Sequence, residues 1–182
     1  MFGRTRSRVA RFDDRVDTLF DKLRGRPVPD RLFYAASELG DFSLVWLLLA
    51  TARSLRSERD EQAALRMVVC GTIEFVLVNG VIKSFFRRKR PQVDDGWVRP
   101  HHLRMPLTSS FPSGHATAAA CHVILLSDGD PLWPAYVAIG ALVASSRVYV
   151  KIHHASDVLA GVGLGAILGL TAKRLWPLPP KP

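Results

Sequence analysis

Apolar residues along the chain gather into five blocks that polar segments separate. Each block approaches the length of a bilayer-spanning helix once its neighbouring turns are included. The blocks cover residues 32–52, 63–82, 114–126, 132–146 and 155–172. The pattern therefore predicts an all-α integral membrane helical bundle with about five transmembrane helices, and we expect residues 1–182 to form a single domain with the bundle at 32–172.

Polar side chains interrupt several blocks, so a soluble protein with buried core helices is the alternative interpretation. The interrupting residues are Glu38, Asp41, Arg66, Glu74 and Asn79. Polar residues inside membrane spans usually face the bundle interior or a watery cavity. We therefore expect a polar site within the bundle.

An amphipathic helix is predicted before the first block. In residues 8–24 apolar side chains recur at spacings of three and four, charged side chains fill the other face, and Gly25 and Pro27 end the pattern. Mixed charges and a short apolar stripe favour a helix that lies in the membrane interface over a cleaved secretory signal. Residues 176–182 are a proline-rich tail that we expect to be too short to fold.

Composition narrows the choice of partner. The 182 residues include 25 Lys+Arg against 16 Asp+Glu, a formal charge of +9, so an anionic partner is expected: nucleic acid, an anionic membrane face or phosphate. Because 48% of residues are hydrophobic, disorder is excluded and no nucleic-acid partner is expected. Cys70 and Cys121 lie in apolar blocks without a metal-binding pattern, so no metal or other cofactor is expected.

Three polar segments between the blocks suit a phosphate ligand. Residues 83–91 place five cations in eight residues before a proline, a pattern that also suits a membrane-surface anchor. Residues 110–115, Ser-Phe-Pro-Ser-Gly-His, end a loop and open a helix whose free N–H groups can face an anion. His153 and Asp157 stand at i and i+4 on one helical face, so the carboxylate can orient the imidazole.

Taken together, these segments resemble the type 2 phosphatidic acid phosphatase family, also called the lipid phosphate phosphatase superfamily, which shares its site with vanadium haloperoxidases. The family's three motifs are present in order: Lys-x6-Arg-Pro from Lys83 to Pro91, Pro-Ser-Gly-His from Pro112 to His115, and Ser-Arg-x5-His-x3-Asp from Ser146 to Asp157. They frame about 75 residues, and the flanking helical blocks extend the likeness over most of the chain.

The resemblance implies a phosphatase that needs no metal and works through a phosphohistidine. By this likeness His153 is the nucleophile, Asp157 holds its other nitrogen, and His115 is the general acid and later the base. The groups that would hold the phosphoryl oxygens are Lys83, Arg90, Ser113, Gly114 and Arg147. Three fixed cations would replace a metal ion.

We expect the other polar residues near the motifs to take no part in catalysis. His154 could compete for Asp157, but the motif spacing selects His153. Solvated, surface or packing roles are expected for His101, His102, His122, Arg87, Arg88 and Lys89. Glu74 and Asn79, inside the second span, are expected to line a lipid groove.

The distribution of charge predicts the orientation. With five spans, 18 basic residues fall on the side of the site and 7 on the other, or 15 against 7 without the catalytic Lys83, Arg90 and Arg147. The positive-inside rule then predicts a multi-pass protein of the cell inner membrane with its site at the cytoplasmic face. Many members of the family have an additional N-terminal span and an outward-facing site, and this sequence departs from that pattern.

A phospholipid or polyprenyl phosphate is the substrate that the resemblance implies. Candidates are a polyprenyl phosphosugar such as decaprenylphosphoryl-5-phosphoribose, a polyprenyl diphosphate, phosphatidic acid and phosphatidylglycerol phosphate. A cytoplasmic site favours the first, because its phosphosugar would come from a cytosolic precursor. The alternative is a non-catalytic basic membrane protein that binds anionic lipids, but binding alone requires neither His115 nor a His153/Asp157 pair. The sequence carries no signal for an oligomeric state.

Overall fold

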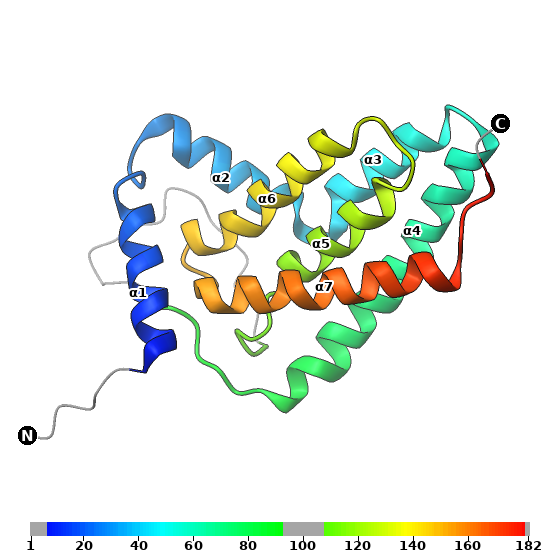
Figure 1. Cartoon of the computed structure of the whole chain (residues 1–182). Coiled ribbons are helices and arrows are strands. Elements are labelled where there is room, and N and C mark those ends of the chain that lie inside the picture. The colour runs from blue at the N-terminus through cyan, green and yellow to red at the C-terminus, as the bar shows by residue number, and fades with distance from the viewer. Residues whose placement is uncertain (1–6, 93–107, 181–182) are drawn as a thin grey trace, which may run out of the picture.

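A computed structural model describes residues 7–92 and 108–180, and over these ranges the chain forms helices and no strand (Figure 1). The elements are α1 (Arg8–Asp21), α2 (Pro27–Leu39), η1 (Asp41–Ser43), α3 (Leu44–Ser54), α4 (Glu58–Val76), η2 (Leu77–Val81), η3 (Ile82–Phe85), α5 (Gly114–Leu126), α6 (Trp133–Tyr149) and α7 (Ala155–Leu175). The predicted all-helical class is confirmed.

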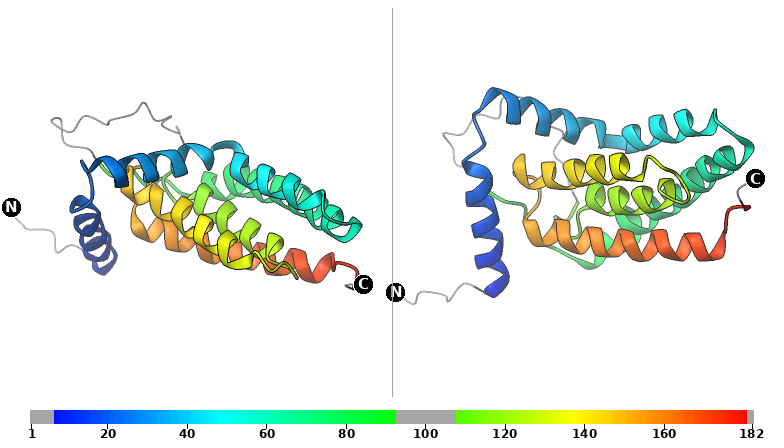
Figure 2. Two further views of the ribbon diagram at one scale, coloured as in Figure 1. Left: turned by 90° about the horizontal axis from the view of Figure 1, so that it is seen from above. Right: turned by 45° about the horizontal axis from the view of Figure 1, so that its top comes forward.

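The helices run back and forth along one long axis. The pair α2 and α3, then α4, α5, α6 and α7, alternate in direction along the molecule, and α1 crosses one end of this bundle (Figures 1 and 2). The α4 helix continues through η2 and η3 to Phe85. Four helix ends therefore lie toward the end of the bundle that α1 crosses: the C-terminal ends of this long segment and of α6, and the N-terminal ends of α5 and α7. This arrangement brings the three predicted motifs to one end of the bundle.

Helix length supports part of the five-span prediction. The segment Glu58–Phe85, with 28 residues, and the helix Ala155–Leu175, with 21, are long and apolar enough to cross a membrane. Pro27–Leu39 and Asp41–Ser54 pass the same test only as one span bent by 71°. Gly114–Leu126 is apolar but shorter. Among the described residues two helices, or three with the bent pair, meet the criterion, so the count of five stays a prediction.

The first apolar block is not the continuous helix that its pattern predicts. Phe42 and Ser43 adopt positive φ angles of 52° and 59°, a left-handed conformation that is uncommon for residues with a side chain. This break separates α2 from α3. It also places Asp41 beside the start of α5, where its carboxylate contacts His115.

Small residues allow α5 and α7 to pack closely at the centre of the bundle. A Cβ atom added to Gly161 would lie 2.6 Å from the Ser113 carbonyl oxygen, which leaves room only for glycine. Close to the other end of α5, Trp46, Met67, Leu125 and other apolar side chains form a buried cluster. This packing gives the loops at the ends of α5 and α7 a rigid support.

The α1 helix begins at its cap Ser7 and rests on the bundle by one edge only. Val16 and Phe20 pack against buried residues of α5, α6 and α7. The other apolar side chains of this segment, Val9, Phe12, Leu19 and Leu23, are exposed. Of the segment predicted as a helix, residues 8–24, the part Arg8–Asp21 is helical, and its apolar edge is uncovered at the end of the bundle.

The C-terminal tail has no regular structure but is held in place. The carbonyl oxygens of Trp176 and Pro179 accept hydrogen bonds of 2.9 and 2.8 Å from Arg66 and Arg59. The tail was expected to be unfolded because it is short. Its described part, residues 176–180, has no helix or strand, and two arginines of α4 bind it.

Candidate active site

His153 lies in the short loop between α6 and α7 and is 2% exposed. Its Nδ1 atom is 2.7 Å from the carbonyl oxygen of Ser110, so Nδ1–H donates to that oxygen. The other ring nitrogen, Nε2, is then unprotonated, and it lies 3.4 Å from an Arg90 nitrogen. Because arginine has only donors, Arg90 donates this long hydrogen bond to the Nε2 lone pair, and a phosphoryl group that binds Arg90 would free the lone pair for attack.

The surroundings of His153 favour its neutral form. Burial lowers the pKa of His153 to about 3, and the positive charges of Arg147 and Arg90 act in the same direction, while Asp157 opposes them. The ring is consequently neutral at physiological pH. A neutral imidazole is the nucleophilic form.

Asp157 supports His153 less directly than the motif implies. Its Oδ2 atom is 3.8 Å from His153 Nδ1, beyond hydrogen-bond distance. The same oxygen accepts hydrogen bonds from the Ser110 hydroxyl and, at 2.9 Å, from the His154 backbone N–H. Asp157 therefore holds the segment that carries the carbonyl acceptor of His153. His154 does compete for Asp157, but through its backbone and not its ring.

His115 and Arg147 meet Asp41 and α2 on the other side of the site. His115 Nε2 is 2.8 Å from Asp41 Oδ1, which orients the ring. The buried Arg147 side chain donates to the Ser37 hydroxyl, and its Nε has no hydrogen-bond acceptor among the described residues. A buried guanidinium with an unused donor is suited to an anionic ligand.

Lys83 and the N-terminus of α5 approach each other closely. Lys83 Nζ donates to Asn79 Oδ1 at 2.8 Å. A Cβ atom on Gly114 would lie 3.2 Å from that same Nζ atom. Ser113 caps α5 by accepting the Ala116 N–H at 3.4 Å. Glycine at the first position of α5 thus lets the helix N-terminus and the lysine cation face one ligand.

A cavity of about 290 Å³ joins these groups. Of the eight predicted site residues, five line it: Lys83, Gly114, His115, Arg147 and His153. The other three, Ser113, Arg90 and Asp157, are not among the lining residues. Arg90 donates to the carbonyl oxygens of Ile152 and Thr108 at 2.9 and 3.1 Å. Glu74 and Asn79, expected in a lipid groove, also line this cavity.

A network behind the cavity was missed by the sequence interpretation. Arg88, expected at the surface, donates to Asp157 at 2.6 Å, to Ser156 at 2.8 Å and to Asp13 of α1 at 2.7 Å. Asp13 is buried and also accepts the Ser156 backbone N–H at 2.8 Å. In the sequence Asp13 is one of several charges on the polar face of an amphipathic helix, so no local signal distinguishes it.

The remaining histidines have structural roles or lie outside the described ranges. His122 stacks on Trp46 with ring centroids 5.6 Å apart and bonds to the Ala118 carbonyl oxygen, so it is a packing residue. His101 and His102 fall outside the residues that the structure describes. Within the described ranges, no group of three His, Cys, Asp or Glu side chains is placed to hold a metal ion.

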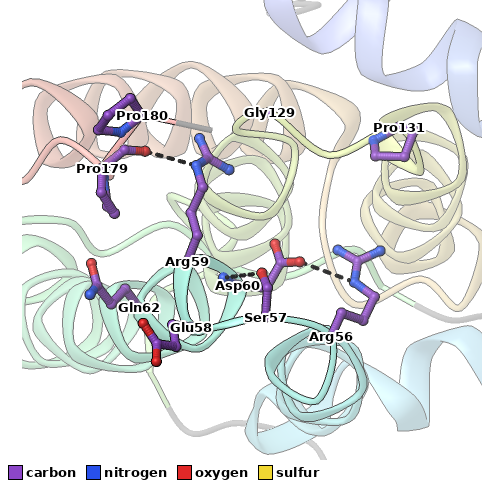
Figure 3. A pocket seen from close by; sticks show the side chains of 10 residues that line it. All are labelled: Arg56, Ser57, Glu58, Arg59, Asp60, Gln62, Gly129, Pro131, Pro179 and Pro180. Carbon is purple, nitrogen blue, oxygen red and sulfur yellow. Dashed lines mark hydrogen bonds and ion pairs between the residues drawn. The ribbon is translucent and has the colours of Figure 1, made fainter. Parts of the chain in front are cut away.

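A larger cavity, of about 860 Å³, lies toward the opposite end of the bundle, between the start of α4, the loop before α6 and the tail (Figure 3). Its two arginines already have hydrogen-bond or ion-pair partners. Arg59 donates to the Pro179 carbonyl oxygen at 2.8 Å, and Arg56 lies 3.3 Å from Asp60. These contacts therefore give this cavity a structural role in holding α4, the loop before α6 and the tail together.

Comparison with known protein families gives a match over residues 63–178 to the PAP2 superfamily. The chain belongs to the PAP2 superfamily. The matched residues contain all three motifs. A relative named decaprenylphosphoryl-5-phosphoribose phosphatase, from Mycobacterium tuberculosis, is 33% identical over 135 residues, which are 73% of this chain and 72% of the relative. An undecaprenyl-diphosphatase from Sulfolobus acidocaldarius is 33% identical over 67% of this chain and 59% of its own length.

Solved structures of PAP2 phosphatases share the fold. The transmembrane PAP2 type phosphatidylglycerolphosphate phosphatase from Bacillus subtilis superposes with a TM-score of 0.70 over 93% of this chain and 87% of its own, at 24% sequence identity. LpxE from Aquifex aeolicus gives 0.69 over 96% and 99%, also at 24% identity. This likeness shows the fold, and two helices of the described residues are long and apolar enough to cross a membrane.

Proposed function

We propose that this PAP2 protein is a metal-independent lipid phosphatase that removes a terminal phosphate from a lipid-linked substrate through a phosphohistidine. The observation that carries the proposal is the shared cavity. The nucleophile candidate His153, the acid candidate His115 and the cations Lys83 and Arg147 all line one space of about 290 Å³. An anion-binding protein would need the cations but not the two oriented histidines.

In the first step the Nε2 lone pair of His153 attacks phosphorus, and the bond from phosphorus to the leaving oxygen breaks. His115 gives a proton to that oxygen as the lipid-linked alcohol or phosphate leaves. Lys83, Arg147 and the Gly114 N–H face the non-bridging oxygens, with Arg90 behind His153 and the Ser113 hydroxyl at the helix cap. Nδ1–H keeps its bond to the Ser110 carbonyl, so positive charge on the phosphorylated ring is offset by that dipole and by Asp157.

In the second step water replaces the histidine. His115, now neutral, accepts a proton from water, whose oxygen attacks phosphorus as the bond from phosphorus to Nε2 breaks. Inorganic phosphate is released and His153 regains its lone pair. The two histidines thus return to their starting protonation states without a metal ion.

The substrate class follows from the relatives. The named activities of the relatives are directed at a polyprenyl phosphosugar and an undecaprenyl diphosphate, and a solved neighbour acts on phosphatidylglycerol phosphate. We favour decaprenylphosphoryl-5-phosphoribose or a similar polyprenyl phosphosugar, because the relative with that name is 33% identical over 73% of this chain and 72% of its own length. Phosphatidic acid completes the set to be tested.

The proposal includes a single domain of residues 1–182 in the cell inner membrane. In it residues 32–172 form five spans, residues 8–24 lie at the interface, and the site faces the cytoplasm. The exposed apolar edge of α1 and its position across the site end of the bundle support the interfacial placement. The 15 to 7 ratio of non-catalytic basic residues supports the orientation.

Phosphate release from the four lipids, measured on the purified protein in detergent, tests the proposal. We expect hydrolysis of at least one of them, inhibition by vanadate, which adopts the five-coordinate geometry of the transition state, and no loss of rate with EDTA. A His153→Ala protein serves as the control for contaminating phosphatase. Absence of turnover on all four lipids would refute the activity, and restoration by Mg²⁺ after chelation would refute the metal-free mechanism.

A further inference from the structure

Glu74 is a buried acidic side chain in the wall of the site cavity that the mechanism does not use. It is 3% exposed, and its Oε1 atom receives no hydrogen bond from any described residue. A buried carboxyl oxygen without a donor is costly, because it loses its bonds to water and gains none from the protein. Its neighbourhood is therefore suited to a ligand that brings a donor.

The position of Glu74 along its helix shows which part of a substrate it would meet. Glu74 precedes Lys83 by nine residues in the continuous segment Glu58–Phe85, about 13 Å along the axis at the usual helical rise. Asn79 lies between them and contacts Lys83. All three line the same cavity.

Beyond Glu74 the wall becomes mostly apolar. A second cavity of about 230 Å³ lies along the same helix, and its lining includes Met67, Val68, Gly71 and Phe75 together with the polar side chains of Thr72 and His122. Phe42, Ser43 and Phe75 line both cavities. One helix face thus presents, in order, a cation, an amide, a carboxyl group and an apolar groove.

A lipid phosphate has the same order of groups. Its phosphate fits the cation end, its chain fits the apolar groove, and the part between them meets Asn79 and Glu74. We propose that Glu74 is a specificity-determining residue that accepts a hydrogen bond from a hydroxyl group of the leaving group, next to the phosphate that is removed. The substrate class is then a lipid-linked sugar phosphate or glycerol phosphate with a free hydroxyl. This inference rests on the proposed function.

A diphosphate offers no such donor. Its second phosphate, as an ionised group, has only acceptor oxygens to place beside Glu74, so it brings no donor for the unpaired Oε1 atom. The site therefore selects against polyprenyl diphosphates. That selection distinguishes among substrates that the phosphate-binding cations alone would treat alike.

Paired substrates that differ only in hydroxyl groups test the inference. One pair is a polyprenyl phosphosugar and its dideoxy analogue; the other is phosphatidylglycerol phosphate and the analogue without the secondary hydroxyl of the terminal glycerol. For the wild type we expect kcat/KM to favour the hydroxylated member of a pair about tenfold, the usual effect of one hydrogen bond to a buried acceptor. In Glu74→Leu that ratio should fall to near one.

Two further variants separate recognition from folding. Glu74→Gln keeps an acceptor oxygen and should retain part of the ratio. Glu61→Leu changes an exposed acid near the opposite end of the same helix and should leave the ratio as in the wild type. A ratio near one in an active wild type, or an equal loss on both members of a pair in Glu74→Leu, would overturn the inference. If the wild type hydrolysed no lipid phosphate at all, the proposed function itself would be refuted, and with it the basis of this inference.

Discussion

At the scale of single residues, the site depends on one fixed hydrogen bond. The Ser110 carbonyl oxygen holds Nδ1–H of His153 and thereby directs the lone pair of Nε2 toward the cavity. Asp157 acts one step further away, through the Ser110 hydroxyl and the His154 backbone. The chemistry therefore requires His153 itself, while Asp157 contributes orientation and negative charge.

Substitutions at these positions should differ in severity. We expect His153→Ala to release phosphate at below about 0.1% of the wild-type rate, because the nucleophile is gone. Asp157→Asn should keep about 1–10%, because asparagine retains an acceptor but loses the charge that holds Arg88. Steady-state kinetics on folded protein measures both. The matched control is His154→Ala; if that variant were inactive and His153→Ala active, the nucleophile would be His154.

Burial of His153 also predicts an acid-sensitive fold. Burial lowers its pKa to about 3 from an ordinary value of 6.5, so as the pH falls the unfolded chain binds the proton first. Stability is therefore full above about pH 6.5 and is lost as the pH falls toward 3. At pH 5 the loss is about 2 kcal/mol, or roughly 4–8 °C in Tm for a chain of this size.

Thermal unfolding in detergent at pH 8 and pH 5 checks this expectation. His153→Asn, which cannot titrate, should lose less Tm than the wild type between the two pH values. An equal loss in both proteins would show that other groups set the acid sensitivity.

At the scale of elements, α1 is tied to the chemistry through its polar face. Asp13 accepts hydrogen bonds from the Ser156 backbone and from Arg88, and Arg88 in turn holds Asp157. Arg24, at the end of the same segment, donates to the carbonyl oxygens of Tyr149 and Val148 at 2.8 Å each, where α6 ends. The loop that carries His153 is thus held at both of its flanking helices by one element outside the bundle.

Loss of Asp13 should therefore lower turnover from a distance. Asp13→Ala leaves the Ser156 N–H without its acceptor and Arg88 with one acid partner fewer, so we expect kcat to fall about tenfold with a smaller change in KM. Asp13→Asn, which keeps an acceptor, should be intermediate. Arg15→Ala, an exposed charged residue of the same helix, is the control.

Measurements of kcat, KM and Tm for Asp13→Ala and the wild type decide this prediction. If Asp13→Ala lowered only the Tm and left kcat unchanged at a temperature where the protein is folded, α1 would support the fold and not the site.

At the scale of the whole molecule, the two ends differ in how their charges are compensated. At the end opposite the site, Arg53, Arg56 and Arg66 pair with Asp60, Asp130 and Asp128. Acidic partners contribute little to membrane orientation, which follows the number of basic residues, and that number is larger at the site end. The charges of α1 make its crossing of the bilayer costly, by about 2.5–3.5 kcal/mol for each charge near the membrane centre.

Cysteine labelling tests the orientation. Thr108 is exposed and lines the mouth of the site cavity. In a background without Cys70 and Cys121, Thr108→Cys should react with a membrane-impermeant maleimide only after cells are opened. A cysteine on the opposite end, at the exposed Leu55, is the matched control and should react in intact cells with a permeable outer envelope. The reverse pattern would place the site outside and remove the reason for preferring a cytosolically made substrate.

Much of the molecule could be predicted because its determinants are local in the chain. Each apolar block is mostly helical in the structure, and the block 114–126 has the same bounds as the helix Gly114–Leu126, since helix periodicity is set by near neighbours. The motif residues stand at helix ends, so their spacing alone brings Lys83, His115, Arg147 and His153 toward one end of an alternating bundle. Local patterns therefore predict the fold class, the family and the motif residues, five of which line the cavity: Lys83, Gly114, His115, Arg147 and His153.

Only the tertiary structure decided how these residues are supported. Asp41 reaches His115 across 74 positions of the chain and Asp13 reaches Arg88 across 75, and no local pattern encodes a contact between helices so far apart in sequence. The break at Phe42 and Ser43, hidden within an apolar block, turns Asp41 toward the site. The role of Glu74 likewise could not be inferred from the sequence, because only the packed structure shows that its carboxyl group is buried and that its Oε1 atom has no hydrogen-bond donor. The catalytic motifs at the helix ends can therefore be recognised from local sequence. The residues that orient and support the catalytic side chains come from distant parts of the chain, and only folding brings them together.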